Sequence, residues 1–156
     1  MIEQNNKNKF PLVSEEITFV GDKYKRCALY YPLLRKCLEN AQTGKSVADL
    51  LFNMGIFCVG LYAVNEFTDY VLRDRNLSKL SEVRVYDRNY EKFQGFYAGK
   101  LVNSTEEAVK DYNKSMIKKI IICNLTSADE IYKDFINRKI NKRDILTIDM
   151  LIYGMG

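Results

Sequence analysis

The chain has 156 residues, of which 47% are hydrophobic, and this is enough for one domain with a buried core. Its 24 Lys and Arg against 20 Asp and Glu give a net charge of +4, spread along the sequence without a basic cluster, which disfavours nucleic-acid binding. The chain has no histidine, so a Ser-His-Asp or Cys-His catalytic arrangement is excluded and a conventional zinc site has too few ligands.

The four cysteines are scattered and form no C-x-x-C pair. Cys58 and Cys123 lie in apolar runs, where a thiol acts as a small hydrophobe, and we expect all four thiols to be reduced and unpaired. The polar start of the chain lacks the apolar region of a signal peptide, and no stretch approaches the roughly 18 apolar residues of a membrane span. These features predict a cytoplasmic protein without a membrane span.

Residues 1–43 are expected to form a lead-in and a helix, ahead of one α/β domain over residues 44–156. Residues 1–10 are polar and predict a loosely docked segment. Between residues 24 and 42 apolar side chains recur at intervals of three and four, which is typical of one helical face. Pro32 predicts that this helix begins near it or bends there. The members of the face are Cys27, Tyr31, Leu34, Leu38 and Ala41.

Four continuous apolar runs predict the strands of one parallel sheet, because strands buried on both faces show no alternation. The runs are 56–59, 83–87, 120–123 and 145–148, with Leu101–Val102 as a short edge strand. Helices are predicted between them, with N-caps at Ser46 and Ser104 and an amphipathic segment after Ser127. This alternation predicts an α/β fold: a single Rossmann-like domain with a mostly parallel sheet of four to five strands and an N-terminal helical extension.

The turn after the first strand is the position where a dinucleotide-binding G-x-G-x-x-G motif belongs. We align the motif with Gly60, Leu61, Tyr62, Ala63, Val64 and Asn65, where only the first glycine remains. Asp87 follows 22 residues after Asn65 (87 − 65 = 22), near the spacing of the carboxylate that binds a ribose hydroxyl. Tyr62 is expected to point at the mouth of the next helix and to decide what the crevice binds.

Two interpretations of this turn stay open. An anion could bind at the helix N-terminus in a displaced pose, or Tyr62 and Asn65 fill a crevice that no longer binds a nucleotide. For Asp87 the alternative is an acid that accepts hydrogen bonds from loop N–H groups.

Polar residues after other strands are further candidates. Asn124 and Thr126 follow the strongest strand, where ligand-facing loops lie, or they cap the next helix. Arg88 could meet a phosphate, although a surface arginine usually meets water. The candidate cofactor-binding residues are therefore Gly60, Leu61, Tyr62, Ala63, Asp87, Arg88, Asn124 and Thr126. We assign no catalytic residue and no metal ligand, and the cofactor stays unassigned.

Five stretches resemble, in order and spacing, the Rossmann-like nucleotide-binding module of bacterial surface-polysaccharide loci. They are GKSVADLLFNMGI, FCVGLYAVN, VRVYDRN, KLVNSTEEA and KKIIICNLTSADEI. Such modules occur alone, fused to glycosyltransferases, or ahead of sugar acyltransferases. The resemblance implies a nucleotide or nucleotide-sugar ligand and a glycosyltransferase partner, with Gly60 and Asp87 at cofactor-binding positions.

A second class of function stays open beside this one: a non-catalytic scaffold or partner domain that has lost its dinucleotide ligand. A methyltransferase is disfavoured because its glycine-rich first loop is also missing. A homodimer is compatible with either class.

Overall fold

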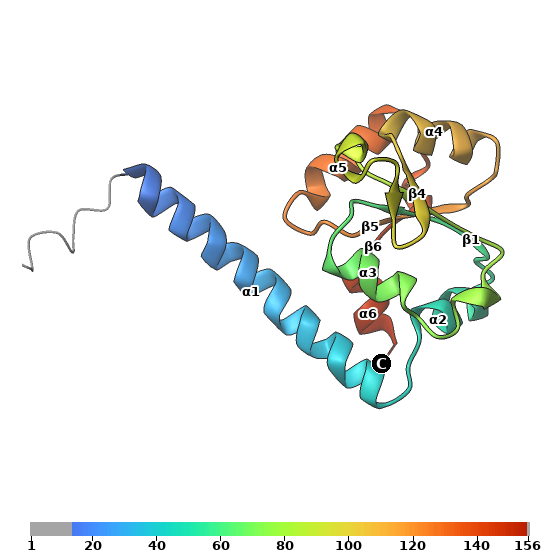
Figure 1. Cartoon of the computed structure of the whole chain (residues 1–156), viewed down its shortest axis with the longest axis horizontal. Coiled ribbons are helices and arrows are strands. Elements are labelled where there is room, and N and C mark those ends of the chain that lie inside the picture. The colour runs from blue at the N-terminus through green and yellow to red at the C-terminus, as the bar shows by residue number, and fades with distance from the viewer. Residues whose placement is uncertain (1–13, 156) are drawn as a thin grey trace, which may run out of the picture. The chain divides into compact units, whose positions relative to one another are not determined.

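The computed structural model describes residues 14–155, with side chains from residue 26 onward, so the expected lead-in over residues 1–10 lies outside the described residues. The chain divides into two compact units after Pro32, and each is described by itself. The first contains the earlier part of helix α1, Ser14–Gln42. The second contains the end of α1 and the whole α/β fold (Figure 1).

Helix α1 is longer than the sequence indicated. It begins at Ser14 and contains Pro32 in its interior, so the prediction that it starts near Pro32 is wrong. Proline removes one backbone donor, yet the helix continues past it because Leu33 and Cys37 in the following turns are buried.

The core of the second unit is a six-stranded sheet in the order β3-β4-β2-β1-β5-β6. Its strands are β1 Cys58–Tyr62, β2 Glu82–Tyr86, β3 Phe96–Tyr97, β4 Lys100–Asn103, β5 Lys119–Ile122 and β6 Ile145–Thr147. The four main strands β2, β1, β5 and β6 pair in parallel, as the continuous apolar runs predicted. The expected mostly parallel α/β sheet is thus confirmed.

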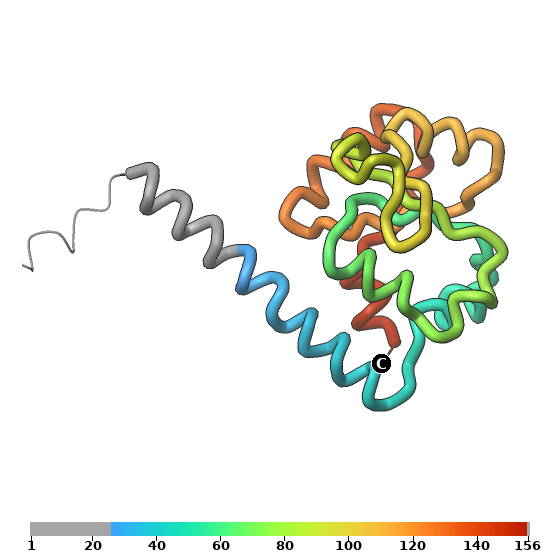
Figure 2. The backbone as a smooth tube through the Cα atoms, in the orientation of Figure 1, coloured from blue at the N-terminus to red at the C-terminus, as the bar shows by residue number. Residues whose placement is uncertain are grey.

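The strand count and one edge differ from the prediction. The piece at Leu101–Val102 belongs to β4, which pairs in parallel with β2 and is not the edge. The edge strand is β3, which runs antiparallel to β4. Figure 2 shows the chain folding back on itself between β3 and β4. Two-residue strands such as β3 are too short to produce a recognisable sequence pattern.

Helices cover both faces of the sheet (Figure 1). Helices α4 and α5 lie on one face, over a core that includes Tyr62, Tyr86 and Phe135. Helices α2, α3 and α6 lie on the other face. The helices of this unit after α1 are α2 Val47–Asn53, α3 Glu66–Leu72, α4 Thr105–Asn113, α5 Ala128–Asn137 and α6 Ile148–Gly154. Short 3-10 helices span Leu77–Lys79, Tyr90–Phe93 and Lys142–Asp144.

Two predicted N-caps are confirmed. The Ser46 hydroxyl accepts a hydrogen bond from the Asp49 N–H at 3.1 Å, and the Ser104 hydroxyl accepts one from the Glu107 N–H at 3.2 Å. Helix α3 begins later than expected, at Glu66 and not near Leu61, and α6 was not predicted at all.

All four cysteines are free thiols, as expected. Cys37 and Cys123 are buried, and burial raises the pKa of these thiols to about 11 and about 12. Cys58 is only partly buried, contrary to its expected place in the core. Between residues 14 and 155 no helix combines the length and the apolar content that crossing a membrane requires.

An ion pair to β5 and a hydrogen bond to α4 meet at Asp144, directly before β6, and give a pH-dependent prediction. Asp144 accepts hydrogen bonds from Lys119 Nζ at 2.6 Å and from the Tyr112 hydroxyl at 2.5 Å. Partial burial raises the pKa of Asp144, but these hydrogen bonds outweigh it and the pKa lies below its ordinary value.

Because the pKa is lower in the folded state, the ion pair stabilises the fold above the unfolded-state pKa of about 3.9 and this contribution is lost as the pH falls further. We expect Asp144→Asn to lower the free energy of unfolding by about 1 kcal/mol at pH 7 and by less at pH 3. Urea unfolding of both proteins at the two pH values checks this. An equal loss in the free energy of unfolding at both pH values would contradict this expectation.

Candidate functional site

The order of the parallel strands defines the class of the fold. Numbered along the chain, the five parallel strands run 3-2-1-4-5 across the sheet (β4, β2, β1, β5, β6). This is the order of a doubly wound dinucleotide-binding sheet, so the chain has a Rossmann-like α/β fold. In such sheets a ligand binds at the carboxyl ends of the strands, where the order reverses, and here that point lies between β1 and β5.

The turn after β1 begins three residues later than the sequence predicted. Gly60 lies in the middle of β1, and Leu61 is fully buried in the same strand. A Cβ atom at Gly60 would lie 2.8 Å from the Tyr86 ring and 2.9 Å from Ile117 Cδ1. Gly60 therefore makes room for neighbouring core side chains and does not form the tight turn we assigned to it.

Tyr62 ends β1 as a core residue. Its ring packs edge-on against Phe135 of α5, with 4.9 Å between the ring centroids. Its hydroxyl lies 2.7 Å from the Thr105 hydroxyl of α4. Burial raises the pKa of Tyr62. The prediction that this side chain points at the mouth of α3 is therefore wrong, whereas its influence on what the crevice binds stays a prediction.

The G-x-G-x-x-G spacing falls instead on Ala63, Asn65 and Thr68. Ala63 follows the strand with a φ of 78°, in the left-handed region that favours glycine. Asn65 is the N-cap of α3, and Thr68 is fully buried in the first turn of that helix. None of the three glycines remains in this alignment, whereas Asp87 now follows Thr68 by 19 residues (87 − 68 = 19), close to the ribose-binding spacing.

The polar groups of this turn bond to each other. The Val64 N–H donates to Asp87 Oδ2 at 2.8 Å. Asn65 Oδ1 accepts hydrogen bonds from the Phe67 and Thr68 N–H groups at 3.0 and 3.3 Å. The Thr68 hydroxyl donates to the Ala63 carbonyl. Four backbone N–H groups of the turn are thus engaged within the protein and are not free to cradle a pyrophosphate: those of Val64, Asn65, Phe67 and Thr68.

Asn65 also connects the two sides of the switch point. Its Nδ2 donates to the Cys123 carbonyl at 2.8 Å, which joins the turn after β1 to the loop after β5. One amide side chain therefore caps α3 and bridges the gap between the two strands where a dinucleotide binds in this class of fold.

The other predicted residues lie around this bridge with internal partners. Asp87, just after β2, accepts through its second oxygen from the Asn89 N–H at 2.7 Å. Arg88 is exposed and lies 3.7 Å from Glu130 of α5. Asn124 Oδ1 accepts from the Thr126 hydroxyl at 2.8 Å and from the Ser127 N–H at 3.2 Å, just before α5. The structure thus brings Ala63, Asp87 and Asn124 to one end of the sheet, and it leaves Gly60, Leu61 and Tyr62 inside β1.

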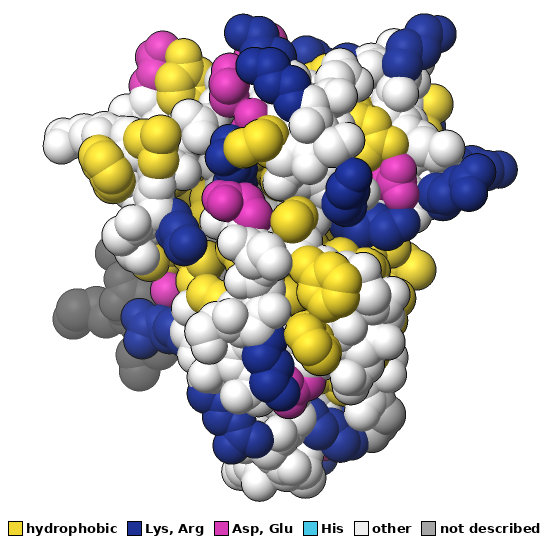
Figure 3. Space-filling view, turned by 90° about the vertical axis from the view of Figure 1, so that its right-hand side faces the viewer, with side chains coloured by type: hydrophobic (Ala, Val, Ile, Leu, Met, Phe, Trp, Pro, Cys, Tyr) yellow, Lys and Arg dark blue, Asp and Glu magenta, His cyan; other side chains and the backbone are white. Residues whose placement is uncertain are grey.

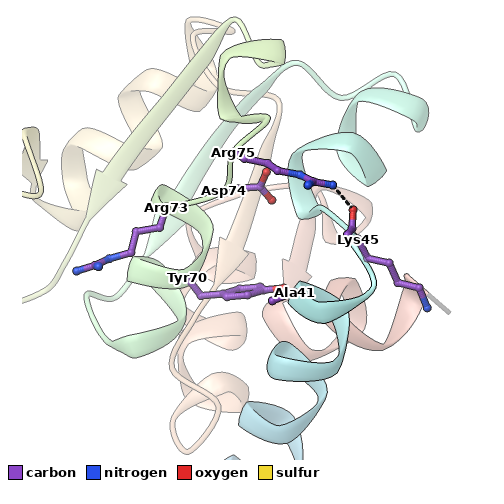
Figure 4. A pocket seen from close by; sticks show the side chains of 7 residues that line it. Ala41, Lys45, Tyr70, Arg73, Asp74 and Arg75 are labelled. Carbon is purple, nitrogen blue, oxygen red and sulfur yellow. Dashed lines mark hydrogen bonds between the residues drawn. The ribbon is translucent and has the colours of Figure 1, made fainter.

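Other hollows lie away from this turn. One of about 190 Å³ is formed by the end of α1 and the segment after α3 (Figure 4). It is lined by Ala41, Gly44, Lys45, Tyr70, Arg73, Asp74 and Arg75. Figure 4 shows Lys45 and Arg73 pointing away from each other, while Arg75 Nη2 donates to the Gly44 carbonyl at 2.6 Å. These cations do not converge on a common point, so the hollow is not built for an anion.

The distribution of charged side chains does not indicate another ligand-binding site. Lys and Arg side chains are scattered over the face drawn in Figure 3 and do not gather at one place. Among the side chains that the structure describes, residues 26–155, no three Cys, Asp or Glu residues are grouped so that they could hold a metal ion. Comparison with protein-family models and with curated proteins finds no match for this chain.

Sequence reasoning offered Asn65, together with Tyr62, as a residue that fills the crevice, but it did not foresee the bond from Asn65 to the Cys123 carbonyl, and it missed the part of Thr68 in the turn. The signal that could have identified them is the spacing Ala63-x-Asn65-x-x-Thr68 directly after the apolar residues of β1, read without requiring a glycine.

Proposed function

We propose that this chain is a non-catalytic partner domain that keeps a Rossmann-like fold and no longer uses its dinucleotide crevice. The observation that supports this is the Asn65 side chain, which caps α3 and bonds to the Cys123 carbonyl across the switch point. Of the two classes left open by the sequence, this geometry favours the domain that has lost its ligand.

The internal hydrogen bonds of the turn after β1 oppose the binding of a pyrophosphate there. A pyrophosphate bound in the usual pose needs free backbone N–H groups and close approach of the backbone. Here it must displace the Asn65 bridge, the cap of α3 and the Asp87 bond to Val64. At about 1 kcal/mol for a neutral hydrogen bond and about 2 kcal/mol for one to a carboxylate, the loss is several kcal/mol, before any ligand contact is made.

A thermal-shift panel with NAD(H), NADP(H), UDP-sugars, coenzyme A and S-adenosylmethionine tests the proposal. We expect no shift in the melting temperature of the wild-type protein. A ligand at 100 times its dissociation constant adds about 2.7 kcal/mol, which for a chain of this size is a shift of roughly 5–10 °C. A shift of that size with any of these ligands would contradict the closed crevice.

The double variant Ala63→Gly, Asn65→Gly is the matched comparison. It restores the first two glycine positions and removes the bridge to Cys123, while glycine keeps most of the N-cap stability. Binding by the variant and not by the wild type supports the view that these two side chains close the crevice.

A nucleotide- or nucleotide-sugar-binding module of bacterial glycosyl transfer is the second candidate. The observation that favours it is Asp87, whose carboxylate lies beside the turn at the end of β2, next to the exposed Arg88. A UDP-sugar that stabilises the wild type, with the shift abolished by Asp87→Ala, would support this candidate over the first.

For the partner itself, the resemblance to modules of polysaccharide loci makes a glycosyltransferase of surface-polysaccharide synthesis our proposal. Such a partner fits either candidate, because accessory modules act through the enzyme to which they bind.

A further inference from the structure

Two basic segments meet where the strands β5 and β6 begin. Residues 113–119 lead into β5, and residues 138–144 lead into β6. Because these strands are parallel neighbours, with Ile120 paired with Ile145, both segments lie at the same edge of the sheet, which we call the amino edge. The segments also touch there, since Lys119 Nζ donates to the Arg143 carbonyl at 3.1 Å.

The amino edge carries the excess positive charge of the chain. The two segments contain seven Lys and Arg and one acid, Asp144, which is a net charge of +6 (7 − 1 = 6). Since the whole chain has a net charge of +4, the rest of it has −2 (4 − 6 = −2). The charge looks evenly spread in the sequence because the two segments lie apart along the chain, and folding brings them together.

Five of the seven cations lack an acidic partner. Lys119 is paired with Asp144 at 2.6 Å, and Arg138 with Asp134 at 3.2 Å. The other five are exposed, and among the side chains that the structure describes none of them forms an ion pair: Lys114, Lys118, Lys139, Lys142 and Arg143. Lys and Arg are spread over this side of the molecule (Figure 3), which suits a broad anionic surface better than a single phosphate group.

The acids near this edge are engaged with other groups and do not neutralise the five cations. The pairs and hydrogen bonds are those of Asp49 with Lys79 at 2.6 Å, Asp74 with the Ser46 hydroxyl at 2.7 Å, Glu82 with Arg84 at 3.1 Å, and the buried Asp111 with Arg84 at 3.1 Å.

Exposed apolar side chains lie beside these cations. Met116, in the loop that leads into β5, is 41% exposed. The Lys118 N–H donates to the Cys58 carbonyl at 2.9 Å, so this loop adjoins the start of β1 and the end of α2. Four large apolar residues are exposed here: Phe52, Met54, Phe57 and Met116. Apolar side chains that stay exposed next to unpaired lysines are typical of a surface that binds a membrane interface.

The residue types favour a lipid surface over a nucleic acid. Four of the five unpaired cations are lysines, which act as point charges, whereas specific phosphate contacts more often use the two-pronged guanidinium of arginine. Bases stack on open aromatic faces, but Phe52 and Phe57 pack edge to face with 5.4 Å between their centroids. At a bilayer, lysine stems lie along the apolar region while their ammonium groups stay at the headgroups.

We propose that the amino edge binds the surface of a membrane that contains anionic lipids, with the five cations at the headgroups and Met54, Phe57 and Met116 inserted between them. This goes beyond the proposed function and does not rest on it, because the turn with Asn65 lies at the opposite, carboxyl ends of the strands. A domain bound in this way holds its carboxyl edge away from the membrane.

Cosedimentation of the full chain with lipid vesicles tests the proposal. We expect binding to phosphatidylcholine vesicles with about one third phosphatidylglycerol, weaker binding as the salt is raised from about 0.1 M to about 0.5 M, and little binding to phosphatidylcholine alone. Lys118→Gln with Lys142→Gln should weaken the binding roughly 30-fold. The matched control is Lys92→Gln with Lys133→Gln, which removes two exposed charges away from the amino edge and should change the binding far less.

The apolar half of the surface has its own variant. Met54→Ser with Met116→Ser leaves every charge in place and should weaken vesicle binding about tenfold, since less apolar surface then enters the interface. Circular dichroism and urea unfolding check that each variant folds like the wild type.

Absence of binding to the anionic vesicles overturns the proposal, and so does an equal effect of the two lysine pairs. Binding to a random-sequence DNA oligonucleotide but not to the vesicles, or vesicle binding that is unchanged by the two serines, also overturns it, because the surface then recognises phosphate charge alone. None of these outcomes depends on the ligand panel, so failure of this proposal and failure of the proposed function can be distinguished.

Discussion

Replacing Tyr62 by alanine is expected to lower the free energy of unfolding by about 3–5 kcal/mol, the range for removing a buried aromatic side chain. The ring is buried at the end of β1 and packs against Phe135, and its hydroxyl bonds to Thr105. The change leaves a cavity between the sheet and helices α4 and α5, which the surrounding side chains only partly fill. Urea unfolding monitored by circular dichroism measures the loss.

Tyr62→Phe is the matched control, because it keeps the ring and removes only the hydroxyl. It leaves the buried Thr105 hydroxyl without this partner, and we expect a loss of about 1 kcal/mol. If Tyr62→Ala is as stable as the wild type, or if it acquires nucleotide binding, Tyr62 lies at the crevice and the core position described here is wrong.

Removing the Asp111 carboxylate is expected to have the second large effect, a loss of about 3 kcal/mol for Asp111→Ala. Asp111 of α4 is only 3% exposed, and its Oδ2 accepts from the Tyr86 hydroxyl at 2.6 Å and from Arg84 Nη1 at 3.1 Å. Burial raises the pKa of Tyr86, and the hydrogen bond and charge of Asp111 raise it further, so the hydroxyl stays a donor. Without the carboxylate, both donors lose a buried acceptor.

Glu82→Gln is the control for the Arg84 side of this network. Glu82 pairs with Arg84 at 3.1 Å, but its side chain is substantially exposed and solvent screens the pair, so we expect a loss below about 1 kcal/mol. Urea unfolding at pH 7 compares the two variants. If both variants lose the same free energy of unfolding, the burial of Asp111 adds nothing to the stability of the protein.

Features that depend on local chemistry could be predicted from the residues alone. The β-branched run Ile120–Ile122 forms a strand as predicted, because its side chains suit a pleated surface buried on both sides. Ser46 and Ser104 marked the starts of α2 and α4, since an N-cap needs only a hydroxyl and N–H groups two or three residues away. The alternation of these elements was enough to predict the parallel sheet.

The position of the first turn, in contrast, depends on contacts between residues that are far apart in the sequence. Gly60 was interpreted as a turn residue because it was aligned with the first glycine of the dinucleotide-binding motif. Instead, Tyr86 and Ile117, which are distant in sequence, occupy the space that a side chain at position 60 would need. The hydrogen bond by which Asn65 bridges the switch point depends in the same way on a distant partner, the Cys123 carbonyl, 58 residues further along the chain. Local propensity carries no information about such partners, and so the sequence predicted the sheet but misplaced the turn that defines its candidate site.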